Sequence, residues 1–231
     1  MPSTVKICGL STAPTLRAAL DAGADMVGFV FFEKSPRHVG LDQARDLAGE
    51  ARGRAKIVAL TVDPSDHGVA AIVAGLEPDL LQLHGKESPE RVAELQRRFG
   101  VAIMKAVGVA DAQDFAKARE YAEVADWLLI DAKPPKGAVL PGGNGVPFDW
   151  RLARDFAPPR PWLLSGGLDP ANVGEAIRLS GASGVDVSSG IESAPGVKDI
   201  DKIKAFVAAA RTGFSNAPSP LAGEGSRAAA G

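Results

Sequence analysis

The single cysteine of the chain, Cys8, closes a short apolar run that begins near Val5. Side chains alternate along a strand, so Cys8 and Lys6 would share one face. A thiol in an electropositive setting has a lowered pKa and can act as a general base or a nucleophile. A lone cysteine is also commonly a small buried hydrophobic residue. Cys8 therefore has two interpretations, a catalytic group and a core side chain.

An acidic residue, Asp131, ends the apolar run 127–130. A carboxyl group in apolar surroundings keeps its proton to higher pH, as a general acid requires. The alternative is a cap or turn residue for the loop that follows. The residue types alone leave both interpretations open.

Two segments rich in glycine and serine, 165–167 and 188–190, follow the last two apolar runs. Glycine allows the backbone to approach a ligand, and backbone N–H groups together with serine hydroxyls can hold a phosphate. Each segment alone could be a tight turn. Occurring together after consecutive strands, they predict a phosphate site made of Gly166, Gly167, Ser188, Ser189 and Gly190.

A further set of polar residues is assigned to substrate binding. Gln82 and His84 alternate along one strand and would share a face, although a structural histidine fits equally well. Arg37 follows Pro36 in a rigid turn from which its guanidinium could reach a substrate carboxylate; the alternative is a solvated loop residue. Asp186, in the last apolar run, joins this set. No spacing of histidines and carboxylates suggests a metal site.

Eight short apolar runs predict the strands that would position these residues; they begin near Val5, Met26, Lys56, Leu80, Ala102, Trp127, Pro161 and Gly184. The stretches between them repeat apolar residues at helical spacing; they are 14–22, 41–51, 66–74, 89–99, 111–122, 149–156, 170–179 and 199–211. Strict alternation of strand and helix implies parallel strands joined by helical crossovers. Eight such units predict a closed (β/α)8 barrel, a TIM barrel of the α/β class.

The order of these elements predicts one catalytic barrel domain over residues 1–211. Two connections that follow strands, 32–40 and 132–148, are longer than the others and fall at the face where barrel enzymes place their chemistry. Residues 212–231 are rich in alanine, glycine, serine and proline, and we expect a flexible tail there.

Composition narrows the class of protein. The 231 residues include 26 basic and 28 acidic side chains, a net charge of −2, and 45% are hydrophobic. This is enough for a core and argues against a nucleic-acid partner. One cysteine excludes an internal disulfide. The chain has neither a signal-peptide pattern nor an apolar run near the roughly 20 residues of a membrane span, so we expect a cytoplasmic protein without membrane contact.

Over roughly residues 5–211 the chain resembles the phosphoribosylanthranilate isomerase family. The motifs that carry the resemblance occur in the family order: Lys-Ile-Cys-Gly-Leu, Ser-Pro-Arg, Gln-Leu-His-Gly, Leu-Leu-Ile-Asp, Pro-Gly-Gly-Asn-Gly, Ser-Gly-Gly-Leu and Asp-Val-Ser-Ser-Gly-Ile-Glu. The resemblance implies a barrel enzyme of tryptophan biosynthesis that acts on a small phosphorylated substrate and needs no metal or organic cofactor. It leaves open whether the enzyme is a monomer or a homodimer.

The resemblance also implies residue roles. Cys8 stands at the position of the general base, Asp131 at that of the general acid, and Arg37 at that of the residue that binds the anthranilate carboxylate. In the implied Amadori rearrangement the acid opens the ribose ring to a Schiff base, and the thiolate removes the C2′ proton. The site must then lower the pKa of Cys8, and we expect Lys6 and nearby N–H groups to do so. Asn144 stands where the family more often has threonine, which concerns one loop contact.

Three other functions are alternatives to this interpretation. The related aldose–ketose isomerase of histidine biosynthesis has an aspartate where this chain has Cys8. A barrel that only binds a phosphorylated ligand would need neither a base nor an acid. A third possibility, a ribulose-phosphate epimerase, would need metal ligands, and three histidines argue against it.

Overall fold

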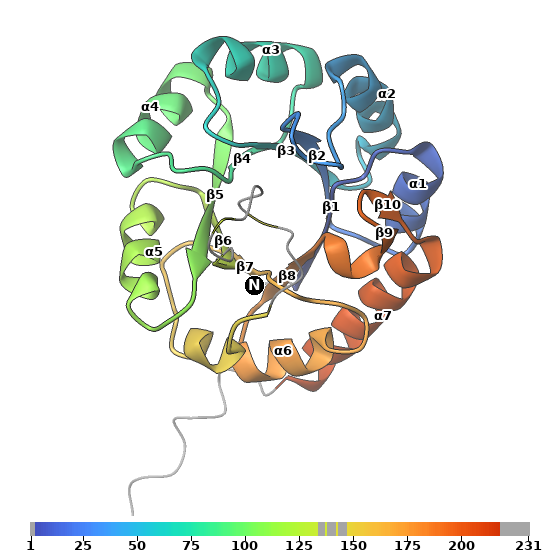
Figure 1. Ribbon diagram of the computed structural model, residues 1–231, viewed down its shortest axis with the longest axis vertical. Helices are drawn as coiled ribbons and strands as arrows, with labels where there is room; N and C mark the ends of the chain where they lie inside the picture. Colours follow the sequence, from blue (N-terminus) through green and yellow to red (C-terminus); the bar gives the residue numbers. More distant parts are fainter. Residues whose placement is uncertain (1–2, 134–136, 138–141, 143–146, 218–231) are drawn as a thin grey trace, which may run out of the picture.

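A closed barrel of eight parallel strands forms the centre of the computed structural model, which describes residues 3–133, 137, 142 and 147–217 (Figure 1). Each strand pairs with the next in the sequence, and β8 pairs with β1 to close the ring. The predicted (β/α)8 fold is confirmed. The strands are β1 (Thr4–Cys8), β2 (Met26–Phe31), β3 (Lys56–Thr61), β4 (Leu80–Leu83), β5 (Ala102–Val109), β6 (Trp127–Ala132), β7 (Trp162–Leu164) and β8 (Gly184–Val187).

The strands are apolar on both faces because each lies between the barrel interior and a helix. Outward positions such as Ile7, Val27 and Leu81 belong to the large core between strands and helices. Alternate positions face the interior and form a smaller core: Met26, Val58, Leu80, Met104, Ala106, Leu129 and Leu163. This alternation aims the side chains at the strand ends into the mouth of the barrel.

Seven α-helices in the described ranges surround the barrel (Figure 1). Local signals set their ends: the hydroxyls of Ser65 and Ser88 cap α3 and α4, and the left-handed glycines Gly100 and Gly181 terminate α4 and α6. The helices are α1 (Ala13–Asp21), α2 (Leu41–Ala51), α3 (Asp66–Leu76), α4 (Pro89–Phe99), α5 (Asp114–Ala122), α6 (Val173–Ser180) and α7 (Ile200–Asn216).

The helix expected over residues 149–156 is wrong. A single 3-10 turn, η1 (Trp150–Ala153), follows β6 in its place. The carboxylate of Asp149 accepts the backbone N–H of Arg151 at 3.1 Å and caps this turn. Two prolines follow at positions 158 and 159, and helices usually end before the residue that precedes a proline. The short stretch between the cap and the prolines favours one tight turn over a full helix.

The last helix, α7, is longer than expected. It runs to Asn216, so the flexible tail expected from residue 212 is wrong for residues 212–216. Phe214 packs against the core from the final turn, and this contact stabilises the added length of helix. Residues 218–231 of the expected tail lie outside the described residues.

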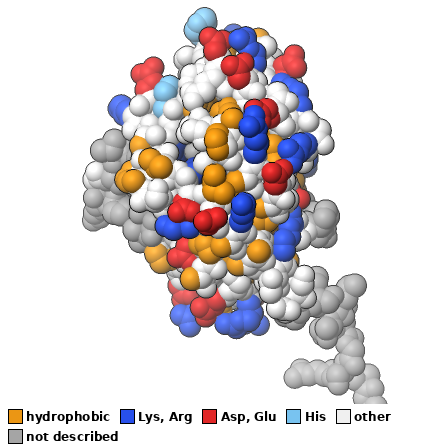
Figure 2. All heavy atoms as spheres, turned by 90° about the vertical axis from the view of Figure 1, so that its right-hand side faces the viewer, with side chains coloured by type: hydrophobic (Ala, Val, Ile, Leu, Met, Phe, Trp, Pro, Cys, Tyr) orange, Lys and Arg blue, Asp and Glu red, His pale blue; other side chains and the backbone are white. Residues whose placement is uncertain are grey.

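A short antiparallel hairpin, β9 (Glu192–Ala194) and β10 (Val197–Lys198), stands outside the barrel between β8 and α7 (Figure 1). Figure 2 shows the side of the molecule that lies at the right of Figure 1, where hydrophobic, acidic and basic side chains are mixed. Within the described ranges, no helix combines the length and the apolar character needed to cross a membrane.

Candidate active site

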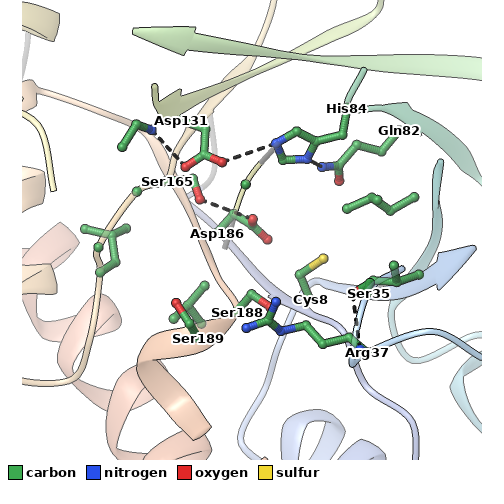
Figure 3. Close-up of a pocket in the computed structure, with 18 of the residues that line it drawn as sticks. Cys8, Ser35, Arg37, Gln82, His84, Asp131, Ser165, Asp186, Ser188 and Ser189 are labelled. Atoms are coloured by element: carbon green, nitrogen blue, oxygen red, sulfur yellow. Dashed lines mark hydrogen bonds and ion pairs between the residues drawn. The ribbon is translucent and has the colours of Figure 1, made fainter. Parts of the chain in front are cut away.

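A pocket of about 810 Å³, counting space open to solvent, lies at the carboxyl ends of the strands (Figure 3). Ten of the eleven site residues expected from the sequence line it, and Gly190 does not. Gly190 packs instead on the backbone carbonyl of Leu168, where a Cβ atom would collide. The segments after β7 and β8 therefore touch each other beside the pocket.

Cys8 ends β1 and lines the pocket with 3% of its surface exposed. Gly28 of the neighbouring strand leaves room for the thiol, since a Cβ atom there would lie 3.0 Å from Sγ. Burial raises the pKa of the Cys8 thiol, and the nearby ammonium of Lys6 offsets only part of that rise. The expected lowering of this pKa is therefore wrong for the free protein, because desolvation outweighs the cation.

The ammonium group of Lys6 forms an ion pair with Asp186. The fully buried Lys6 Nζ donates to Asp186 Oδ1 at 2.7 Å, and the register of β1 against β8 sets the two residues side by side. Burial lowers the pKa of Lys6, but Asp186 and Cys8 outweigh burial and leave it raised. Ser165 Oγ donates to the other carboxylate oxygen at 3.4 Å. Asp186 thus lines the pocket as the partner of a buried cation.

Asp131, the second-last residue of β6, begins a row of three side chains across the pocket (Figure 3). Its Oδ1 accepts the N–H of Ala132 at 2.8 Å, and its Oδ2 lies 3.2 Å from Nε2 of His84. The other ring nitrogen of His84, Nδ1, lies 3.1 Å from Nε2 of Gln82. With the amide as donor, Nδ1 accepts, and the ring proton on Nε2 points at the carboxylate of Asp131.

The same row allows a second arrangement of protons. Gln82 Oε1 is buried and finds no hydrogen-bond partner among the described residues. Half a turn of the amide would let Oε1 accept from Nδ1–H of His84. Nε2 would then be an acceptor, and a protonated Asp131 could donate to it. The pair Gln82–His84 can therefore accommodate Asp131 with or without its proton.

Arg37 lines the pocket from the loop after β2 and is 6% exposed, unlike a solvated loop residue. Its Nε donates to Glu192 Oε1 at 2.7 Å and its Nη2 to Glu192 Oε2 at 2.9 Å. Lys198 Nζ also donates to Glu192 Oε1, at 2.8 Å. Hydrogen bonds from Arg37 and Lys198 outweigh the effect of burial and lower the pKa of Glu192. Sequence reasoning missed both hairpin residues, although Glu192 closes a motif that it quoted.

The glycine-rich segments expected to bind phosphate both reach the pocket through Gly166, Gly167, Ser188 and Ser189. Gly166 and Gly167 have φ values of 86° and 68°, which side chains other than glycine rarely adopt. A Cβ atom at Gly166 would also lie 2.6 Å from the backbone nitrogen of Ala132. The β7 segment therefore packs closely against the end of β6 and presents bare backbone to the pocket.

Part of the loop expected over 132–148 lies outside the described residues, including Asn144. Gly142, which is described, sits against the row of polar side chains: a Cβ atom there would lie 2.5 Å from His84 Nε2 and 2.6 Å from Asp131 Oδ2. In the described ranges no group of three or more histidine, cysteine, aspartate or glutamate side chains could hold a metal ion.

Several proteins with known names are similar to this sequence. A protein-family model described as N-(5'phosphoribosyl)anthranilate (PRA) isomerase matches residues 5–209. An N-(5'-phosphoribosyl)anthranilate isomerase of Rhodopseudomonas palustris (strain BisA53) is 60% identical over 211 residues, which cover 91% of this chain and 97% of that protein. The protein of the same name from Paracoccus denitrificans (strain Pd 1222) is 58% identical over 210 residues, or 91% and 98% of the two chains.

Solved structures share the fold. Phosphoribosyl anthranilate isomerase from Thermotoga maritima superimposes with a TM-score of 0.81 at 35% identity, over 91% of this chain and 99% of that one. A phosphoribosyl anthranilate isomerase in complex with reduced 1-(o-carboxyphenylamino)-1-deoxyribulose 5-phosphate gives 0.78 at 34% identity, with the same coverage. Sequence and fold agree along nearly the whole barrel, and the chain belongs to the N-(5'-phosphoribosyl)anthranilate isomerase family of enzymes.

Proposed function

We propose that this isomerase of tryptophan biosynthesis converts N-(5-phosphoribosyl)anthranilate to 1-(2-carboxyphenylamino)-1-deoxyribulose 5-phosphate, with Cys8 as general base and Asp131 as general acid. The observation that carries the proposal is that both side chains line one pocket, from β1 and β6, beside the glycine-rich segments after β7 and β8 (Figure 3). A ring held between a carboxyl and a thiol can be protonated at one atom and deprotonated at another.

Asp131 supplies the first proton. As an acid it protonates the ribose ring oxygen, the C1′–O bond breaks, and the nitrogen lone pair forms a Schiff base at C1′. The row through His84 to Gln82 supports this role because one arrangement of its protons accepts a hydrogen bond from protonated Asp131. Once Asp131 has given up its proton, the other arrangement donates to the carboxylate. General acid catalysis of this kind is worth roughly 10²–10⁴ in rate.

Cys8 removes the C2′ proton after the ring has opened. The base must be the thiolate, whereas burial favours the thiol in the free protein. Two cations favour the thiolate during turnover: Lys6, which already acts on Cys8, and the positive charge of the Schiff base beside it. Deprotonation gives an enolamine. A proton added at C1′ and one lost from the C2′ hydroxyl give the ketone, so the reaction neither gains nor loses protons.

The two anionic ends of the substrate position its ring. We propose that Gly166, Gly167, Ser188 and Ser189 hold the phosphate, as segments after the last two strands of barrels commonly do. Gly190 supports this site through its packing on Leu168. Arg37, fixed by Glu192, receives the anthranilate carboxylate, and Gln82, His84 and Asp186 complete the walls. The relative noted above binds a ligand that carries both a phosphate and a carboxyl group.

Other proposals concern the protein as a whole. We propose that the barrel, together with the whole of α7, is one catalytic domain. We also propose that it acts in the cytoplasm without a cofactor and binds neither nucleic acid nor membrane. A monomer and a homodimer are both compatible with a pocket lined by a single chain. Sedimentation velocity distinguishes the two states.

The decisive experiment is an assay with freshly generated phosphoribosylanthranilate that follows the loss of anthranilate fluorescence. Turnover by the purified protein supports the proposal. Calorimetric binding of the substrate without turnover would favour a ligand-binding barrel. Turnover of the corresponding intermediate of histidine biosynthesis, and not of phosphoribosylanthranilate, would favour the related isomerase.

A further inference from the structure

The β9–β10 hairpin buries an ion pair that the proposed reaction does not use. Lys198 and Glu192 are register partners in the hairpin, and their side chains are 1% and 5% exposed. Burial lowers the pKa of Lys198, although Glu192 opposes this effect. Removing two charges from water is costly, and a buried pair is weak evidence of added stability. The pair contacts Arg37 and Ser188, which line the pocket, and these contacts suggest a role in binding.

Glu192 lies between two cations. Its Oε1 accepts from Arg37 Nε at 2.7 Å and from Lys198 Nζ at 2.8 Å. Its Oε2 accepts from Arg37 Nη2 at 2.9 Å and from the N–H of Gly196 at 3.3 Å. The two parallel bonds to Arg37 fix the plane of the guanidinium as well as its place, as a bidentate pair does.

Lys198 continues the connection to the segment after β8. Its Nζ donates to the carbonyl of Ser188 at 2.8 Å and to the hydroxyl of Ser188 at 3.2 Å, as well as to Glu192. These three acceptors match the three donors of an ammonium group. The contacts hold both the backbone and the side chain of Ser188, which lines the pocket.

Gly9, the residue after Cys8, completes the arrangement. A Cβ atom at this position would lie 2.8 Å from Arg37 Cδ and 3.2 Å from Ser188 Oγ. Arg37 and Ser188 therefore pack on the backbone that follows the thiol. One connected set, Arg37, Glu192, Lys198 and Ser188, spans the residues proposed for the two ends of the substrate and borders the strand end that carries Cys8.

We propose that Glu192 is a positioning residue that sets the spacing between the carboxylate-binding Arg37 and the phosphate-binding segment at Ser188. The proposal rests on the function proposed above. A rigid spacing between the two anion sites holds the ribose carbons at a fixed place relative to Cys8, and small misplacements of reacting atoms are costly in rate.

The charges predict a distinctive kinetic signature. Glu192 is the only negative charge of the connected set, beside two cations. Replacing Glu192 with glutamine removes this negative charge and leaves the two cations, so the attraction for an anionic substrate persists. The orientation of Arg37 is lost, however. Glu192→Gln should therefore lower kcat by about ten- to a hundredfold, with a smaller change in KM.

Binding of two ligands tests the spacing without turnover. The first is the reduced product analogue, and the second is the same compound made from aniline, which lacks the carboxyl group. The ratio of their Kd values measures how well Arg37 recognises the carboxylate. We expect Glu192→Gln to shrink this ratio by about fivefold or more, because an oriented charge-assisted pair is lost. Lys198→Met should leave the ratio near the wild-type value and weaken the binding of inorganic phosphate.

Controls separate positioning from folding. Glu175→Gln removes an exposed carboxylate whose one ion pair among the described residues is with Arg178 on α6, and it should match the wild type in every assay. Glu192→Asp keeps the charge on a shorter arm and should recover part of kcat. The proposal is overturned if Glu192→Gln leaves kcat unchanged, if KM alone rises, or if both analogues weaken equally while Tm falls. The ratio of Kd values stays measurable even if the wild type fails to turn over phosphoribosylanthranilate, so the two failures are distinguishable.

Discussion

At the amino-terminal end of the barrel, three aspartates stand immediately before β2, β4 and β6 and make the same pair of contacts. The side-chain Oδ2 accepts the N–H of a residue in the preceding strand, at 2.7, 2.7 and 2.8 Å. The N–H of each aspartate donates to the carbonyl of that same residue at 2.9 Å. The pairs are Asp25 with Val5, Asp79 with Ile57, and Asp126 with Ile103.

The aspartates at the carboxyl end share no such pattern. Asp131 meets the ring of His84, whereas Asp186 meets the ammonium of Lys6. The amino-terminal contacts repeat because each closes the same backbone geometry between neighbouring strands. At the other end the groups differ, as the proposed function requires, because a substrate has different chemistry at each atom. The repeated contacts are typical of a stabilising role for the amino-terminal carboxylates, whereas reaction chemistry is what we propose for Asp131 in the pocket.

The strongest test of this division lies in the pocket. Cys8→Ala and Asp131→Asn each remove a proposed proton-transfer group and should lower kcat by at least about 10²-fold. Thermal stability should change little, and the affinity for the reduced product analogue should stay within about tenfold. Fluorescence kinetics, calorimetry and thermal melts measure the three quantities. Near-normal turnover by either variant would remove the proposed role of that residue.

Arg37→Ala should act on binding more than on chemistry. Loss of a charge-assisted pair with the substrate carboxylate should raise KM by about tenfold or more. Initial rates over a range of substrate concentrations separate KM from kcat. An unchanged KM would reduce Arg37 to a packing partner of Glu192.

The pH dependence tests the state of the thiol. The pKa of Cys8 is raised by burial, so the free enzyme holds a thiol that must lose its proton to act. We expect kcat/KM to increase with pH, by up to about tenfold per unit, until the pH passes that raised pKa. Lys6→Met should move the rise to still higher pH, because Lys6 lowers the pKa of Cys8. The pH profile of kcat/KM and the rate of thiol alkylation check the rise and its shift in the variant. A plateau of kcat/KM that is already reached well below neutral pH would contradict the raised pKa of Cys8.

The smallest effect is expected at the amino-terminal end. Asp79→Ala deprives the N–H of Ile57 of its acceptor and should cost about 1–2 kcal/mol of unfolding free energy, with kcat/KM unchanged. Denaturant titration measures the loss. Asp42→Ala is the matched control, because the one ion pair that its carboxylate makes within the described ranges is an exposed one with Arg45. A fall in kcat/KM with no loss of stability would contradict the division between the two ends.

Much of the fold followed from local patterns. The alternation of apolar runs and amphipathic stretches predicted eight strands in the right places, and the ranges expected for α2 and α4 match the structure. The helix predicted over 149–156 was wrong because apolar spacing does not show how many residues are available for a helix before two prolines. The repeated aspartates were missed because an acidic residue before a strand resembles an ordinary turn residue. Their common place, one residue before a predicted strand, was the available signal.

The site divides in the same way. Cys8 and Asp131 close apolar runs, which predicted their places near strand ends, and the pocket brings them together. The partner of Arg37 could not be predicted, because Glu192 lies 155 positions away in a hairpin outside the barrel pattern. The direction of the pKa shift of Cys8 was also beyond sequence reasoning. This direction depends on how completely the folded chain removes water from the thiol. It also depends on how far Asp186 neutralises the charge of Lys6.

By itself, the sequence determined the order of strands and helices and the identity of the thiol and the carboxyl group, because periodicity and alternation are properties of neighbouring residues. The tertiary structure alone decided which charges meet, which are buried and which proton states they favour. These properties depend on distance and solvent access between segments far apart in the chain, and only closure of the barrel sets those distances.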